Sequence, residues 1–161
     1  MTNSIRKLVR ADRSHLAEIL AATAEFTPDE AEVALELIDS ALEGGSDYEV
    51  LVAETAAVPT GYICFGHTAM TQGTYDLYWV CVRPSDKGKG IGRALVAAME
   101  AELTKRGALL VRVETEGSDA YDATRAFYDS IGYERAAVFA DFYRPGVDLV
   151  TYRKVVAKAA R

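Results

Sequence analysis

Three alternating glycines, Gly88, Gly90 and Gly92, lie between a strand-like run and a helical pattern, at a spacing suited to binding a charged group. The run Leu77 to Val82 is rich in aromatic and β-branched residues, and the helical pattern begins at Arg93. Glycines at the start of a helix allow backbone N–H groups to close on an anion, with the positive end of the helix dipole behind them. The spacing therefore predicts a phosphate-binding loop on a strand–loop–helix unit.

This loop differs from two common nucleotide-binding motifs. A Walker A loop ends in a Lys-Ser/Thr pair that holds phosphate and magnesium, and that pair is missing. A dinucleotide fingerprint needs Gly-x-Gly-x-x-Gly within a βαβ unit, whereas these glycines alternate and follow a predicted hairpin. The basic residues Lys87, Lys89 and Arg93 surround the glycines, which is more than a structural turn requires.

The elements around the loop follow a mixed α/β order. Hydrophobic periodicity and turn residues predict strands at 5–10, 48–54, 61–67, 77–82, 109–115, 138–143 and 147–156. Helices are predicted to begin near Asp12, Thr27, Arg93 and Asp122, with a capping box formed by Thr27 and Glu30. The order is β-α-α-β-β-β-α-β-α-β-β, in one domain over residues 1–156 followed by a frayed tail at 157–161.

Composition, charge and residue spacing argue against a nucleic-acid partner, a membrane segment and a metal site. The chain of 161 residues has 24 acidic and 18 basic side chains and a net charge of −6, which argues against nucleic acid as an obligate partner. No apolar leader or membrane-length segment is present, so we expect a cytoplasmic protein without membrane contact. No His/Cys/Asp/Glu spacing suggests a metal site, and Cys64 and Cys81 are expected to be buried, reduced thiols.

Two motifs resemble those of the GNAT superfamily of N-acetyltransferases. Val82-x-Pro84 followed by Lys87-Gly88-Lys89-Gly90-Ile91-Gly92 is similar to the acetyl-CoA loop of that family. Ala126-Phe127-Tyr128-x-x-x-Gly132-Tyr133 resembles its second signature, a helix that carries a tyrosine and ends at Gly-Phe/Tyr. The resemblance implies a GNAT-type fold, a twisted and mostly antiparallel sheet of about seven strands flanked by about four helices.

The resemblance also implies how acetyl-CoA, the acyl donor, would be bound without a metal. Backbone N–H groups of the loop would hold its pyrophosphate, and the strand edge near Val80 would pair with the pantetheine arm. Tyr121 stands where many members have an asparagine that contacts this arm, so that contact is open. The residues expected at the donor are Val80, Cys81, Val82, Lys87, Gly88, Lys89, Gly90, Ile91, Gly92, Arg93 and Thr124.

Tyr128 is the candidate general acid. A phenol has an ordinary pKa near 10, so it stays protonated at pH 7 and can protonate a departing thiolate. Helical spacing predicts a packed stripe of Ala123, Phe127 and Ile131, with Tyr128 on another face together with Thr124. The alternative is an amphipathic tyrosine of the core.

The general base has two candidates, Asp76 and Glu114. On a regular strand, residues 76, 78, 80 and 82 share one face, which would place Asp76 beside the thioester. Asp76 could equally be a turn residue, and Glu114 near the end of the next strand is its rival. Either carboxylate could act through water or only orient a cationic substrate.

The acceptor is expected to be the primary amine of a small molecule or amino acid. The resemblance places specificity in the loop between the first two helices and in the last hairpin. Aromatic walls with an aspartate suit a small cation, and the candidates are Phe26, Tyr78, Asp141 and Tyr143. Acetylation of protein N-termini or lysines, and a non-catalytic acyl-CoA-binding regulatory domain, are the alternatives. A homodimer is common in the family.

Overall fold

The structure is a computed structural model of the chain, and it describes residues 3–157. The strands are β1 (Ser4–Lys7), β2 (Tyr48–Thr55), β3 (Val58–His67), β4 (Thr74–Val82), β5 (Leu110–Glu116), β6 (Glu134–Arg144) and β7 (Val147–Val155). The helices are α1 (Arg13–Ala22), α2 (Pro28–Glu43), α3 (Ile91–Lys105) and α4 (Asp122–Ser130). Short 3-10 turns span Arg10–Asp12, Pro84–Asp86 and Asp119–Tyr121.

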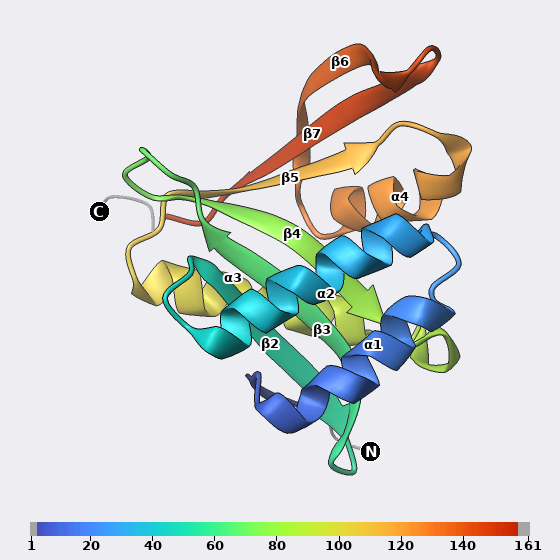
Figure 1. The fold of residues 1–161 in the computed structure, drawn as a ribbon. Helices are drawn as coiled ribbons and strands as arrows, with labels where there is room; N and C mark the ends of the chain where they lie inside the picture. Colours follow the sequence, from blue (N-terminus) through green and yellow to red (C-terminus); the bar gives the residue numbers. More distant parts are fainter. Residues whose placement is uncertain (1–2, 158–161) are drawn as a thin grey trace.

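The predicted mixed α/β fold is confirmed. The seven strands form one sheet in the order β1-β2-β3-β4-β5-β7-β6, in which only the β4–β5 pair is parallel among the described strands. Helices α1 and α2 cover one face, and α3 and α4 cover the other (Figure 1). Part of the predicted tail, residues 158–161, lies outside the described residues.

Local sequence signals explain most element boundaries. The Thr27 hydroxyl accepts from the Glu30 N–H, and the Glu30 carboxylate accepts from the Thr27 N–H, so the predicted capping box starts α2. Asp12 does not cap α1 with its side chain. Its buried carboxylate instead accepts hydrogen bonds from the Arg6 guanidinium and from the Val9 N–H, which ties β1 to the turn that follows.

The last hairpin departs from the prediction at its start. β6 begins at Glu134, four residues before the predicted Val138, and every residue of it is exposed. β6 lies at one edge of the sheet, and no buried face imposes an alternation of apolar and polar residues on it, so its start could not be read from such an alternation. Figure 1 shows this hairpin projecting beyond the helices.

Candidate active site

Strands β4 and β5 separate halfway along their length. Their pairing runs only from Thr74 with Leu110 to Leu77 with Val113. Beyond that point, β4 pairs only with β3, and β5 pairs only with β7. The two strands diverge, as Figure 1 shows. We call this divergence, between Tyr78–Val82 and Glu114–Glu116, the wedge. The edges of both strands that face the wedge have no strand partner.

The glycine loop lies at the end of β4 and opens α3. Gly88 and Gly90 both have φ of 79°, in the left-handed region that favours glycine. Within residues 3–157, no backbone N–H from Gly88 to Arg93 donates a hydrogen bond, and the first helical bond runs from Ala94 to the Gly90 carbonyl. Six consecutive donors are therefore free at the positive end of a 15-residue helix.

This loop fits the pyrophosphate of coenzyme A. A Cβ added at Gly88 or Gly90 would meet nothing within 4 Å, so the outer side of the loop is open to an incoming group. A diphosphate needs several donors that converge on one point, and free N–H groups at a helix start provide them. The predicted donor site is thus compatible with the observed backbone.

Two of the three predicted basic side chains are already paired. The Lys87 ammonium contacts a Glu25 carboxylate oxygen at 2.8 Å, and the Lys89 ammonium contacts Asp86 at 2.7 Å. Asp86 also accepts from Arg83 at 2.5 Å. The expected cationic pocket is therefore largely neutralised, and the free N–H groups remain as the main anion-binding feature of the loop.

A β-bulge overturns the predicted face pattern of β4. Cys64 pairs with Trp79 and Phe65 with Leu77, so Tyr78 is the extra residue. Leu77 and Val80 pack with the α3 side of the core, whereas Tyr78 and Trp79 both pack with the α1 and α2 side.

The prediction that residues 76, 78, 80 and 82 share one face is consequently wrong. The bulge reverses the alternation after Tyr78, so Val80 and Val82 face α3 and α4, opposite to Tyr78. Cys81 is buried towards α1, where its thiol lies 3.3 Å from the Thr23 hydroxyl. Both cysteines are free and buried, as predicted.

The two candidate bases differ in availability. Asp76 accepts from Arg112 Nε at 2.6 Å and from the Thr68 hydroxyl at 2.8 Å, so both its oxygens are engaged. Its side chain is 14% exposed, against 46% for Glu114. Glu114 lies 3.7 Å from the Arg112 guanidinium and makes no hydrogen bond among the described side chains. Of the two, Glu114 is the carboxylate that can accept a proton.

Tyr128 is the most buried residue of α4, which corrects the predicted helix face. Its ring packs against Phe127, Tyr133 and Tyr152 at centroid distances of 5.4, 5.6 and 5.8 Å. Phe127 and Ile131 are only half-buried and Ala123 is exposed, because α4 lies on the sheet with its Tyr128 side inward. Burial raises the pKa of the Tyr128 phenol above its usual value.

The Tyr128 hydroxyl is enclosed less completely than two other tyrosine hydroxyls, although the residue is only 3% exposed. It makes no hydrogen bond within residues 3–157, yet it is not among the unpaired polar atoms that are completely enclosed. The hydroxyls of Tyr62 and Tyr133, in contrast, are enclosed and unpaired. Thr124, one helical turn before Tyr128, is half-buried on the same helix. Tyr128 thus combines a phenol of raised pKa with a hydroxyl that is not completely enclosed.

The predicted acceptor residues do not all come together. Phe26, in the α1–α2 loop, packs edge-on against Trp79 at 6.2 Å, and Tyr143 is 47% exposed on β6. Tyr78 turns towards the start of β2. Asp141 lies at the hairpin tip with φ of 56°, and its carboxylate accepts from the Gly146 N–H at 2.6 Å. That carboxylate shapes the turn.

Tyr121, predicted to stand beside the pantetheine arm, contacts two residues at the α1–α2 loop and the start of α2, Glu25 and Glu30. The Tyr121 hydroxyl donates to the Glu25 carbonyl at 3.3 Å and lies 3.4 Å from the Glu30 carboxylate. Burial raises the pKa of Tyr121 to about 12, with the charges of Glu30 and Glu116 adding to the effect. Only the unusual tyrosine at position 121 could have signalled this arrangement.

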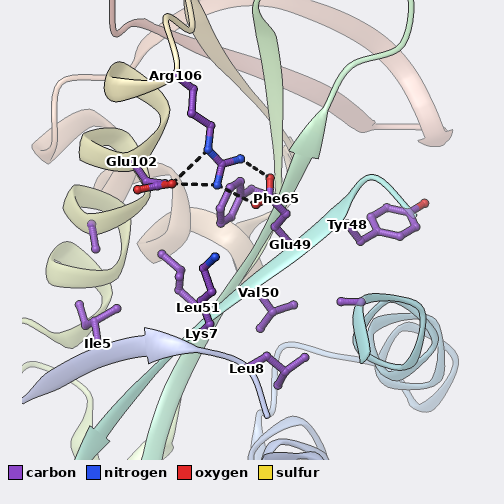
Figure 2. Close-up of a pocket in the computed structure, with 12 residues that line it drawn as sticks. Ile5, Lys7, Leu8, Tyr48, Glu49, Val50, Leu51, Phe65, Glu102 and Arg106 are labelled. Atoms are coloured by element: carbon purple, nitrogen blue, oxygen red, sulfur yellow. Dashed lines mark hydrogen bonds and ion pairs between the residues drawn. The ribbon is translucent and has the colours of Figure 1, made fainter. Parts of the chain in front are cut away.

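A separate hollow of about 370 Å³ lies at the other end of α3 (Figure 2). Its floor is aliphatic and its rim carries Arg106, which binds Glu49 at 2.7 Å and Glu102 at 3.0 Å. With Lys7, which also lines the hollow, the charges balance, and the hollow lies along the second half of α3, away from the glycine loop at its start. It takes no part in the donor site.

Comparison with known proteins identifies the family. The model of the GNAT acetyltransferase domain matches residues 46–135, which include the glycine loop and Tyr128. The chain therefore belongs to the GNAT acetyltransferase family.

Particular relatives support this placement. A ribosomal-protein-alanine N-acetyltransferase from Escherichia coli is 35% identical over 78 residues, which cover 47% of this chain and 51% of the relative. The match thus spans about half the length of this curated relative. A crystal structure of a GNAT-family protein from Desulfovibrio desulfuricans has a TM-score of 0.93 and 38% identity, covering 97% of this chain and 100% of the other.

A third structure, from Salmonella typhimurium, was determined with acetyl-CoA as its cofactor. It has a TM-score of 0.75 and 25% identity, and the match covers 100% of this chain and 98% of the other. Among the described residues, no helix combines the length and apolar character needed to cross a bilayer, and no group of three or more metal-ligating side chains is present.

Proposed function

We propose that the chain transfers an acetyl group from acetyl-CoA to the primary amine of a small cationic molecule. The observation that carries this proposal is the row of free N–H groups from Gly88 to Arg93 at the start of α3. Family membership makes coenzyme A the anion that fits this row. The pantetheine arm would follow the unpaired edge of β4 at Tyr78–Val82, which leads from the loop into the wedge.

The amine would reach the wedge from the side of the sheet that carries α1 and α2. An alkyl ammonium has an ordinary pKa near 10, so it must lose a proton before it can attack the thioester. Glu114 is exposed and has an unbonded carboxylate at the β5 edge of the wedge. We assign it the role of accepting this proton, directly or through water.

The transfer step then balances in charge and protons. The amine lone pair forms a bond to the acetyl carbon, the carbon–sulfur bond breaks and the sulfur leaves as a thiolate, while the nitrogen releases its second proton to water. Tyr128 gives its phenolic proton to that thiolate and regains one from solvent. Because the apolar surroundings raise the pKa of Tyr128, a lasting phenolate is disfavoured there, so the phenol must take up a proton from solvent as it gives one to the thiolate.

Release of free CoA thiol tests the proposal. Purified protein, acetyl-CoA and a panel of diamines, amino acids and N-terminal peptides would be compared with boiled protein. We expect thiol release with at least one small amine and a raised melting temperature with acetyl-CoA but not with NAD or ATP. Stabilisation without thiol release across the panel would indicate an acyl-CoA-binding regulatory domain, and no stabilisation would overturn the proposal.

Acetylation of a protein N-terminus is the second candidate. It is favoured by the similarity to the ribosomal-protein-alanine N-acetyltransferase. The peptides in the same panel test it, because a peptide-modifying enzyme would release more thiol with them than with diamines.

A further inference from the structure

Tyr121 connects two segments that lie on opposite sides of the wedge. It belongs to the turn Asp119–Tyr121, which follows β5, and its hydroxyl donates to the carbonyl of Glu25 in the α1–α2 loop. The same hydroxyl lies 3.4 Å from Glu30 in the first turn of α2. These partners are 96 and 91 residues away in the sequence, so the contact exists only in the folded chain.

Both ends of this connection are anchored. Arg125 donates to the carbonyls of Glu116 and Ser118, at 2.5 and 2.9 Å, which fixes the turn that carries Tyr121. At the other end, the Glu25 carboxylate is held by Lys87 of the glycine loop at 2.8 Å. The phenol of Tyr121 is thus a fixed wall and does not hang freely from the surface.

Charged side chains surround the Tyr121 phenol. Glu30 of α2 and Glu116 of β5 lie near it, and Tyr143 of the last hairpin lies near these two carboxylates and Glu114. Arg144 meets Glu116 at 3.5 Å, and Arg112 is held mainly by Asp76. Glu30 forms no ion pair among the described residues, so its carboxylate leaves a negative charge beside the phenol, which favours a cationic amine.

We propose that Tyr121 closes the side of the acceptor site between the α1–α2 loop and the last hairpin, so that the site admits a small cationic amine and excludes a peptide chain. This inference rests on the proposed function. A peptide would need a continuous groove past the α1–α2 loop, and the bond from Tyr121 to the Glu25 carbonyl crosses that path. A diamine has no peptide backbone, so this hydrogen bond does not obstruct its binding.

The test compares kcat/KM for putrescine and for a hexapeptide with N-terminal alanine. We expect the unmodified protein to prefer putrescine, and Tyr121→Ala to raise the ratio of peptide to putrescine by about tenfold, the size of effect expected when a steric block is removed. Tyr121→Phe keeps the ring but loses the bonds to Glu25 and Glu30, and should shift the ratio in the same direction by a smaller factor.

Phe142→Ala serves as the matched control, since it removes an aromatic ring that is 57% exposed on the same hairpin. It should leave the ratio unchanged, and the KM for acetyl-CoA should stay within about twofold in all variants. If the unmodified protein acetylates the peptide as well as putrescine, or if neither Tyr121 variant moves the ratio, the inference is overturned while the proposed function stands. If neither these probes nor any other amine of the panel releases thiol with the unmodified protein, both proposals are overturned.

Discussion

The donor side and the acceptor side of the wedge are built from different parts of the chain. The donor side consists of backbone N–H groups in one continuous segment, Gly88 to Arg93. The acceptor side consists of side chains from the α1–α2 loop, β5, the turn before α4 and β6. A backbone site tolerates sequence change so long as its φ angles survive, whereas a side-chain site changes with each substitution. We therefore expect single substitutions to change the proposed acceptor side more readily than the proposed donor side.

Gly90→Asp should produce the largest effect, because it attacks the backbone site with a negative charge. Aspartate tolerates the left-handed conformation, so the fold should survive, but its carboxylate would occupy and repel the anion site. We expect acetyl-CoA to bind about 1,000-fold more weakly, equivalent to about 4 kcal/mol of lost charged hydrogen bonds. Titration calorimetry measures this.

Gly107→Asp is the control for that substitution. Gly107 has φ of 81° and open space around its Cβ position, like Gly90, but it follows the other end of α3. Its replacement should leave acetyl-CoA affinity unchanged. Equal weakening by both variants would show that the loop has no special role.

Tyr128→Phe should lower kcat by about 100-fold, the lower range for loss of a general acid. Acetyl-CoA binding should be unchanged, because the phenol does not belong to the anion site. Tyr133→Phe is the matched control, since Tyr133 is also buried and packs against Tyr128 at 5.6 Å. Stopped-flow or steady-state thiol release separates the two variants. A similar fall in kcat for both would assign the effect to packing and remove Tyr128 from the chemistry.

Glu114→Gln and Asp76→Asn separate the two carboxylates of the acceptor side. Glu114→Gln should lower kcat/KM about tenfold at pH 7. The loss should shrink as the pH approaches the pKa of the amine near 10, where the amine is already neutral.

Asp76→Asn should instead lower the free energy of unfolding by about 1.5 kcal/mol, because it leaves Arg112 with only the more distant Glu114 carboxylate as its charged partner. Its pH–rate profile should keep the shape of the unmodified protein. The reverse pattern, with the pH-dependent loss in Asp76→Asn, would identify Asp76 as the base.

Glu25→Gln should have the smallest effect, although Glu25 joins the two sides through Lys87. The hydrogen bond from Lys87 lowers the pKa of Glu25 below its ordinary value of 4.5. The pair therefore stabilises the fold above about pH 4.5, and this contribution is lost as the pH falls through the lowered pKa. Since both side chains are about a third exposed or more, we expect about 0.5 kcal/mol at pH 7.

Chemical denaturation at pH 7 and at pH 3 measures that difference. The gap in unfolding free energy between Glu25→Gln and the unmodified protein should narrow at the lower pH. A gap that widens would mean that Glu25 is destabilising when charged.

Features encoded within a few residues could be predicted from the sequence. The glycine loop and the capping box at Thr27 and Glu30 depend on local backbone preferences, so their residue types reveal them. The order of elements followed from periodicity, and the paired glycine and tyrosine motifs identified the family.

Features that depend on distant partners could not be predicted. The bulge at Tyr78 comes from the pairing of β3 with β4, and it reverses the faces on which the assignment of Asp76 was based. The inward face of α4 is chosen by the sheet beneath it, so spacing alone placed Tyr128 on the wrong side. The contact of Tyr121 with Glu25 spans 96 residues and leaves no local signal.

The central claim is that backbone donors at residues 88–93 hold the pyrophosphate of acetyl-CoA. Titration calorimetry with acetyl-CoA and with S-acetylpantetheine, which keeps the thioester arm but lacks the pyrophosphate and nucleotide, tests it most directly. We expect acetylpantetheine to bind at least about 100-fold more weakly, because the charged hydrogen bonds of the loop are lost. Equal affinities for the two compounds would contradict it.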